Sequence, residues 1–169
     1  MINEVKNYGS HDLVAKLIKE YQRTADASYK ADLRAAVTST IDKAEVNSIV
    51  DKFEDADVIK PQDLRGWYRG LLANHHGQQA AWDWIREDWD WLDKTVGGDM
   101  EFATFITVTT GVFHTPERLK EFKEFFEPKV NIPLLSREIK MDIKVIEGKV
   151  NLIEDEKDAV NSAVAKAID

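Results

Sequence analysis

Apolar residues recur at spacings of three and four along almost the whole chain, which is the period of one face of an α-helix. The helix predicted at 132–153 carries two apolar stripes, a regular one and a thinner one on an adjacent face between positions 134 and 152. Two apolar faces suggest that this helix has neighbours on two sides. No segment alternates with a period of two, and no hairpin dipeptide separates two β-branched runs. The pattern therefore predicts an all-α fold. The most regular stripe consists of Leu135, Ile139, Ile143, Ile146, Val150 and Ile153.

Capping and helix-breaking residues divide this pattern into separate helices. Ser10 is a predicted N-cap for a helix that runs to about Arg23, and a residue near Asp42 opens a later one. Pro61 is expected at a first helical position, and Thr115 followed by proline is a strong start signal. The stretch Gly97-Gly98-Asp99 breaks the pattern. Helical spacing also covers 29–37, 78–92 (one helix or two short ones), 102–111, 132–153 and, as a separate last helix, 154–167.

The loops between these helices are short, which favours antiparallel pairs of consecutive helices. Stacked pairs would give a short superhelix like HEAT or armadillo repeats. No internal sequence repeat supports that arrangement directly, and a compact bundle is the alternative. A length of 169 residues fits one α-helical domain spanning 1–169, and the uncapped helical pattern at 1–8 suits a fragment of a longer chain.

Composition narrows the possible partners and the compartment. The formal net charge is −8 with acidic and basic residues interspersed, so no basic stripe is available for nucleic acid. The absence of cysteine excludes a disulfide framework and a thiolate metal site and fits a reducing cytoplasm. The first residues do not resemble a signal peptide. The longest apolar run, 102–113, is too short to cross a membrane. We therefore expect a cytoplasmic protein without nucleic-acid or membrane partners.

The residue types that carry chemistry are present, but not in catalytic patterns. The adjacent pair His75 and His76 is expected on a turn with the side chains pointing apart, and the chain has no His-Glu-x-x-His zinc motif. Alternation of tryptophan and aspartate from 82 to 91 predicts tryptophans inward and carboxylates outward. A small acidic hydrolase would instead use the carboxylates of Asp83, Glu87, Asp88 and Asp90. No nucleophile elbow or phosphate-binding loop occurs. We therefore predict no catalytic residue and no cofactor in this chain.

Several segments in a fixed order nevertheless resemble one family. They are Trp82-Asp-Trp84-Ile-Arg-Glu-Asp-Trp89, the threonine-rich stretch 100–115, the stretch 117–126 and the long helix 135–150. In this order the sequence resembles the C-terminal helical domain of the M1 zinc aminopeptidases, and the resemblance extends over nearly all of the chain. The family carries His-Glu-x-x-His, a distal glutamate and Gly-Ala-Met-Glu-Asn in its catalytic domain, and this sequence has neither motif.

The resemblance implies a lid. In the family this helical domain arches over the catalytic domain, encloses the substrate chamber and limits which peptides enter. The expected partners are then the catalytic and other domains of a parent aminopeptidase and its peptide substrates, with zinc in the parent's catalytic domain and none here. An exposed, partly apolar patch is expected where the other domains would dock. The alternative is a stand-alone helical-repeat scaffold that binds a protein or peptide in its groove.

Basic residues on the inner face of such a chamber would attract the anionic C-termini of peptides. The candidates for substrate contact are Lys60, Arg65 and Arg69, which lie in or near the helix that begins at Pro61. The simpler interpretation is that they are ordinary surface ions.

Overall fold

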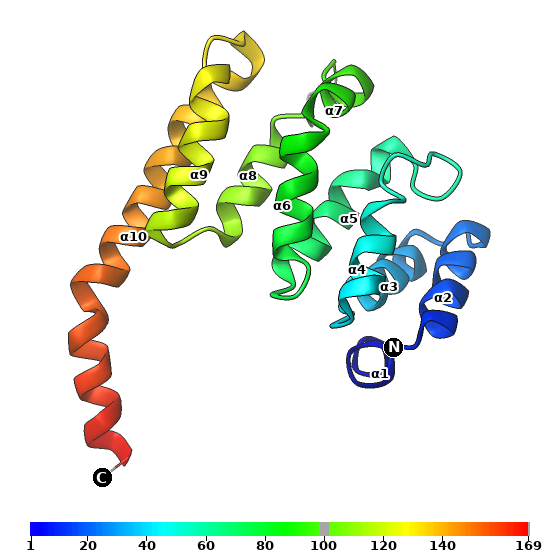
Figure 1. Ribbon diagram of the computed structural model, residues 1–169, viewed down its shortest axis with the longest axis horizontal. Coiled ribbons are helices and arrows are strands. Elements are labelled where there is room, and N and C mark those ends of the chain that lie inside the picture. Colours follow the sequence, from blue (N-terminus) through cyan, green and yellow to red (C-terminus); the bar gives the residue numbers. More distant parts are fainter. Residues whose placement is uncertain (99–101, 169) are drawn as a thin grey trace. The chain divides into compact units, whose positions relative to one another are not determined.

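The computed structural model describes residues 1–98 and 102–168, and among these it contains ten α-helices, one 3-10 turn and no strand (Figure 1). The all-α prediction is confirmed. By its internal contacts the chain divides into two compact units, which are described separately below: unit 1 is Met1–Phe102 and unit 2 is Ala103–Asp169. Two expectations stay predictions. One is that residues 1–169 form a single domain, and the other is that the helices stack into a superhelix like HEAT repeats.

Unit 1 is built from helices that are joined by short links and packed on one another. Helix α2 packs on α3, α3 on α5, and α5 on α6, which also contacts α4 and α7. Only three residues link α2 to α3, so the chain reverses there and the two helices are antiparallel. Its helices are α1 Ile2–Tyr8, α2 His11–Arg23, α3 Ala27–Val37, α4 Lys43–Val50, α5 Pro61–Ala73, α6 Gln78–Glu87 and α7 Trp89–Val96.

Polar side chains fix the starts of several helices. The Ser10 Oγ accepts a hydrogen bond from the Leu13 amide over 3.4 Å, as predicted from the sequence. The Asp42 Oδ1 accepts from the Ala44 and Glu45 amides over 2.7 and 3.2 Å at the start of α4. These bonds satisfy amides that a helix leaves without partners, typically worth about 1 kcal/mol each. They set where each helix begins, and so which residues face the core.

The core of unit 1 is aromatic. Trp67 and Trp82 are fully buried, and Trp84 and Trp89 are nearly so, whereas Asp90 is exposed. The interpretation of this segment as tryptophan inward and aspartate outward is confirmed for these residues. A fully buried aromatic side chain is worth about 1.5–3 kcal/mol of hydrophobic free energy. The tryptophan-rich segment therefore anchors unit 1.

Two glycines allow α3 and α5 to approach closely. A Cβ on Gly66 would lie 2.6 Å from the guanidinium carbon of Arg34. A Cβ on Gly70 would lie 2.9 Å from the Cβ of Thr38 and still closer to its hydroxyl. Both separations are below van der Waals contact. The Arg34 guanidinium is the end of a flexible side chain and can move aside, whereas the Cβ of Thr38 is fixed to the backbone, so Gly70 is the position that requires glycine.

Unit 2 contains α8 Thr104–Val112, α9 Pro116–Phe126, the 3-10 turn η1 Glu127–Lys129 and α10 Pro133–Ile168. Helix α10 packs against both α8 and α9. The Lys149 Nζ donates to the carbonyls of Thr110 and Gly111 over 2.7 and 3.2 Å, which caps the C-terminal end of α8. The stripe of α10 that contains Leu135, Ile139, Ile146 and Val150 is buried in this packing.

One prediction for this last segment is wrong, and another holds only in part. The chain does not break at Glu154, because α10 continues without interruption from Pro133 to Ile168. Helix α10 does have two neighbours, α8 and α9. They do not cover its second apolar stripe, however, because Leu134, Met141 and Val145 are all exposed. Packing, rather than helical structure, ends near Val150, and positions 151–167 are exposed throughout. None of the helices in the described part of the chain combines the length and the apolar character needed to cross a bilayer.

Candidate functional site

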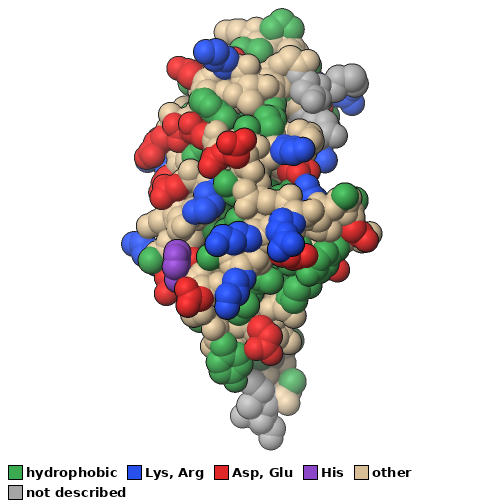
Figure 2. Space-filling view, turned by 90° about the vertical axis from the view of Figure 1, so that its right-hand side faces the viewer, with side chains coloured by type: hydrophobic (Ala, Val, Ile, Leu, Met, Phe, Trp, Pro, Cys, Tyr) green, Lys and Arg blue, Asp and Glu red, His purple; other side chains and the backbone are tan. Residues whose placement is uncertain are grey.

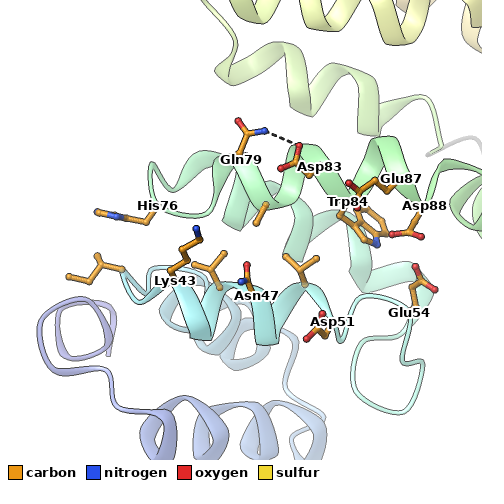
Figure 3. Close-up of a pocket in the computed structure, with 14 residues that line it drawn as sticks. Lys43, Asn47, Asp51, Glu54, His76, Gln79, Asp83, Trp84, Glu87 and Asp88 are labelled. Atoms are coloured by element: carbon orange, nitrogen blue, oxygen red, sulfur yellow. Dashed lines mark hydrogen bonds between the residues drawn. The ribbon is translucent and has the colours of Figure 1, made fainter.

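A groove of about 970 Å³ runs between α4 and α6 in unit 1 (Figure 3). Its apolar lining comes from both helices and from the loop before α4, and consists of Ile41, Val46, Val50, Ala80 and Trp84. Polar residues complete the lining: Lys43, Asn47, Asp51, Glu54, His76, Gln79, Asp83, Glu87 and Asp88. The direct packing of α6 on α4 creates this surface, and the Asp42 cap fixes where α4 begins.

The charges in the groove are separated along its length. Figure 3 shows Lys43 and His76 at one end, and Glu54, Glu87 and Asp88 at the other. Helix α4 ends at Val50 on the acidic side, and the C-terminal end of a helix carries a partial negative charge. Helix α6 ends there as well, although α7 begins directly after it and offsets that contribution. The acidic end therefore combines carboxylates with the negative pole of α4, a setting that attracts a cation.

Most of these carboxylates are not neutralised within the described residues. Asp83 is the exception, because Arg86 forms an ion pair with it and the Gln79 Nε2 donates to its Oδ1 over 2.8 Å. For Asp51, Glu54, Glu87 and Asp88, the described residues provide no lysine, arginine or histidine nitrogen within 4.0 Å. Partial burial of the carboxyl, followed by the nearby Asp88 charge, raises the pKa of Glu54.

Trp84 forms the wall beside these acids. It is 4% exposed, and its ring is held by edge-on contacts with Phe53 at 4.9 Å and Trp91 at 6.3 Å between ring centroids. The Nε1–H of Trp84 lies near enough to Glu54 to act against the rise of that pKa, but it has no acceptor at hydrogen-bond geometry. A buried donor without a partner costs about 1–3 kcal/mol. This nitrogen is itself buried behind the wall of the groove, so the groove presents unneutralised acids but no accessible indole donor.

The predicted substrate-contact residues lie outside this groove. Lys60 occupies the N-cap position of α5 and is exposed. Arg65 is half-buried, and Arg69 is exposed one turn further along the same face of α5. None of the three belongs to the groove lining, and their contact with a substrate stays a prediction.

The histidines are arranged differently from the expectation. The rings of His75 and His76 do not point apart but lie edge to face, 5.8 Å between centroids, and His76 lines the groove. The His11 Nδ1 lies 2.7 Å from the Glu45 Oε1, a contact between α2 and α4 that the sequence does not predict. Within 1–98 and 102–168, no three histidine, aspartate or glutamate side chains are placed to hold one metal ion, so a zinc ion does not fit the described residues.

The sequence pattern predicts Asp83, Glu87 and Asp88 as outward carboxylates, and it gives no sign of the groove that they line. Glu54, on the loop after α4, and the nitrogen of Trp84 are not among the predicted site residues. The sequence shows that acids flank Trp84, but it does not show whether the ring nitrogen finds an acceptor. Glu54 joins the acids of α6 in the groove only because α4 packs against α6, and the sequence does not show this packing.

The sequence of this chain matches a known family of helical domains. Residues 2–148 match the family described as the ERAP1-like C-terminal domain. The chain belongs to this family. The resemblance to the C-terminal helical domain of the M1 aminopeptidases is thereby confirmed. The ERAP1-like C-terminal domain covers α1 to α9 and the packed part of α10, and the match ends close to Val150, where the burial of α10 ends.

Longer proteins contain regions similar to this ERAP1-like C-terminal domain. Aminopeptidase N of Lactobacillus helveticus is 82% identical over 169 residues, which is 100% of this chain and 20% of that protein. Aminopeptidase N of Lactobacillus delbrueckii subsp. lactis is 56% identical over 99% of the chain, again 20% of its own length. Aminopeptidase M1 of Arabidopsis thaliana is 26% identical over 82% of the chain. The chain thus spans about a fifth of the two bacterial relatives.

Proposed function

We propose that this chain is a wall domain of an aminopeptidase, which encloses a peptide chamber and limits access to a catalytic zinc ion bound by another domain. The observation that carries the proposal is the match of the whole chain to one fifth of proteins named aminopeptidase N. In this proposal the whole longer protein hydrolyses peptide substrates, and its catalytic domain binds the zinc ion. The comparisons favour this role over that of a stand-alone scaffold.

A wall needs a rigid body, and the buried aromatic core of unit 1 supports that requirement. It also needs a surface that docks on the rest of the enzyme. The exposed stripe of α10, in which Leu152 is 62% and Val160 is 55% exposed, is the surface that we assign to this contact. Exposed apolar side chains that recur along one helix are typical of an interface.

Basic residues of α5 are proposed to meet peptide carboxylates in the chamber. Arg65 and Arg69 lie four residues apart and so share one face of α5, with Lys60 at its start. Figure 2 shows that Lys and Arg side chains are interspersed with Asp and Glu side chains on the face that it presents. The cytoplasm is the proposed location, because a chain without cysteine suits a reducing compartment.

The test uses the Lactobacillus helveticus relative without the region that this chain matches. Purified chain is added to that truncated enzyme, and co-elution and hydrolysis of an aminoacyl anilide are measured. We expect a stable complex whose activity differs from that of the truncated enzyme, and no hydrolysis by the chain alone. Absence of a complex, or turnover by the isolated chain, would contradict the proposal.

A further inference from the structure

The guanidinium of Arg34 occupies a niche that exists because residue 66 is a glycine. Arg34 lies in the last turn of α3, which packs on α5. A Cβ on Gly66 of α5 would lie 2.6 Å from the guanidinium carbon, 2.6 Å from Nη1 and 2.9 Å from Nε of Arg34. All three separations are below van der Waals contact, so the planar guanidinium fills the space that a side chain at position 66 would take.

This guanidinium has no acceptor within the described part of the chain. Arg34 is half-buried, yet its side-chain nitrogens have no carboxylate oxygen within 4.0 Å and make no hydrogen bond to residues 1–98 or 102–168. The half-buried Arg86 and Arg118 differ, because each forms an ion pair with an acid three residues away. Charged groups that are partly withdrawn from water are usually paired. A guanidinium that is held in place without a partner therefore indicates a site for an anion.

The charges nearest to the niche leave it positive. The one acid of α5, Asp63, has its Oδ2 4.0 Å from the Nζ of Lys30 on α3. Arg69 follows Gly66 by three residues and so lies on the same side of α5. It is exposed and, like Arg34, has no ion pair among the described residues. The crossing of α3 and α5 thus presents two arginines whose charge no described acid neutralises.

We propose that Arg34 and Arg69 bind a carboxylate of a peptide at the crossing of α3 and α5. The planar guanidinium of Arg34 donates two parallel N–H···O bonds to the carboxylate, and Arg69 adds a second positive charge. The choice of a peptide as the source of the carboxylate rests on the proposed function. Arg34 is not among the basic residues predicted from the sequence, and in this proposal it selects peptides that carry a carboxylate at the right place, either at the C-terminus or on an acidic side chain.

The first experiment titrates the full chain with three acetylated peptides and follows the arginine Nε–H resonances by NMR. One peptide is Ala-Ala-Ala-Ala with a free C-terminal carboxylate, the second is Ala-Ala-Glu-Ala amide, and the control without a carboxylate is Ala-Ala-Gln-Ala amide. The signal that disappears in Arg34→Lys assigns the Arg34 resonance. We expect a saturable shift of this resonance with one or both carboxylate peptides, which identifies the source, and binding at least about tenfold weaker for the control. An unmoved resonance, or equal binding of all three peptides, would overturn the proposal.

Two variants test the niche and the charge separately. Gly66→Ala should keep the fold, because the guanidinium is the end of a flexible side chain, but it should displace that group and weaken binding by about tenfold. Its control is Gly148→Ala, where a Cβ meets no atom within 4 Å. Arg34→Gln should weaken binding as much, whereas Arg23→Gln, which removes an exposed arginine at the end of α2, should not. Equal binding within either pair would overturn the proposal.

The last experiment asks whether the bound carboxylate belongs to the substrate. The matched region of the Lactobacillus helveticus relative is replaced by this chain, and a long peptide that binds in the titration is used as substrate. We expect Arg34→Gln to raise KM about tenfold relative to Arg23→Gln, with kcat little changed. An unchanged KM would overturn the assignment to the substrate. The titration needs no catalytic domain, so failure of this site and failure of the wall function can be told apart.

Discussion

The Thr107 Oγ1 in α8 donates a hydrogen bond to the Asp142 Oδ2 in α10 over 3.1 Å, and this bond joins the two helices of unit 2. Asp142 is 4% exposed. Burial raises the pKa of its carboxyl, against the opposing effects of the Thr107 hydroxyl and the Lys149 charge. A raised pKa means that the folded protein binds the proton more tightly than the unfolded chain does. The contribution of Asp142 to stability therefore falls as pH rises from the ordinary aspartate pKa through the raised one.

Asp142→Asn should remove this dependence while keeping an acceptor for Thr107. We expect the variant to gain stability relative to the natural chain as pH is raised from about 4.5 to about 7.5, because the natural chain must then ionise a buried carboxyl. Urea unfolding of both proteins at the two pH values measures the difference. Asp158→Asn, an exposed acid of the same helix, is the control for loss of one charge. A relative loss of stability at the higher pH would contradict the prediction.

Gly70→Ala should destabilise unit 1 by about 1–3 kcal/mol, because the new methyl group would overlap Thr38 at the crossing of α3 and α5. Gly148→Ala is the matched control. It lies within α10 and is exposed, and a Cβ there meets no atom within 4 Å. This second change should stabilise by about 0.5–1 kcal/mol through helix propensity. Thermal unfolding of both variants gives the comparison, and a stabilised Gly70→Ala would contradict the prediction, because the crossing would then have room for a methyl group.

Helix α10 should exchange its amide hydrogens at two different rates. Residues 135–150 are packed on α8 and α9, whereas 151–167 are exposed on all sides. A helical segment of this length without tertiary contacts is marginally stable in water. Hydrogen-exchange mass spectrometry should show exchange faster by about tenfold or more beyond Val150. Uniform protection along α10 in the isolated chain would mean that its last turns have a contact not seen in this structure.

Leu152→Asp with Val160→Asp should weaken the complex of the chain with the truncated Lactobacillus helveticus enzyme by about tenfold or more, because charges would enter an apolar contact. Both positions are exposed, so the unfolding free energy of the chain itself should change by less than about 0.5 kcal/mol. The control, Asn161→Asp with Ser162→Asp, places the same charges on neighbouring exposed polar positions of α10. Unchanged binding of the apolar-site variant would exclude this stripe as the docking surface.

Features of the fold that depend on local chemistry could be predicted from the sequence. The caps at Ser10 and Thr115 and the inward tryptophans follow from a few neighbouring residues and were correct. The boundary expected at Glu154 was wrong because an acidic run resembles a helix start, yet neither proline nor glycine stops α10 there.

The candidate site was beyond prediction because it depends on packing between distant segments. Glu54 and Asp88 lie far apart in the sequence and meet only because α4 packs against α6. Whether a tryptophan nitrogen finds a partner in the core also depends on every neighbour of the ring. The sequence alone gives the residue types of Trp84 and its acidic neighbours, but not the absence of an acceptor.

The measurement that tests the wall function most directly is a comparison of short and long peptides as substrates. The Lactobacillus helveticus enzyme carrying this chain and the same enzyme without the matched region are each assayed for kcat/KM on a tripeptide and on a peptide several times longer. If the chain limits access to the catalytic centre, the enzyme with the chain should discriminate between the two lengths, and the truncated enzyme should lose most of that discrimination. The same ratio of kcat/KM values in both enzymes would contradict the account.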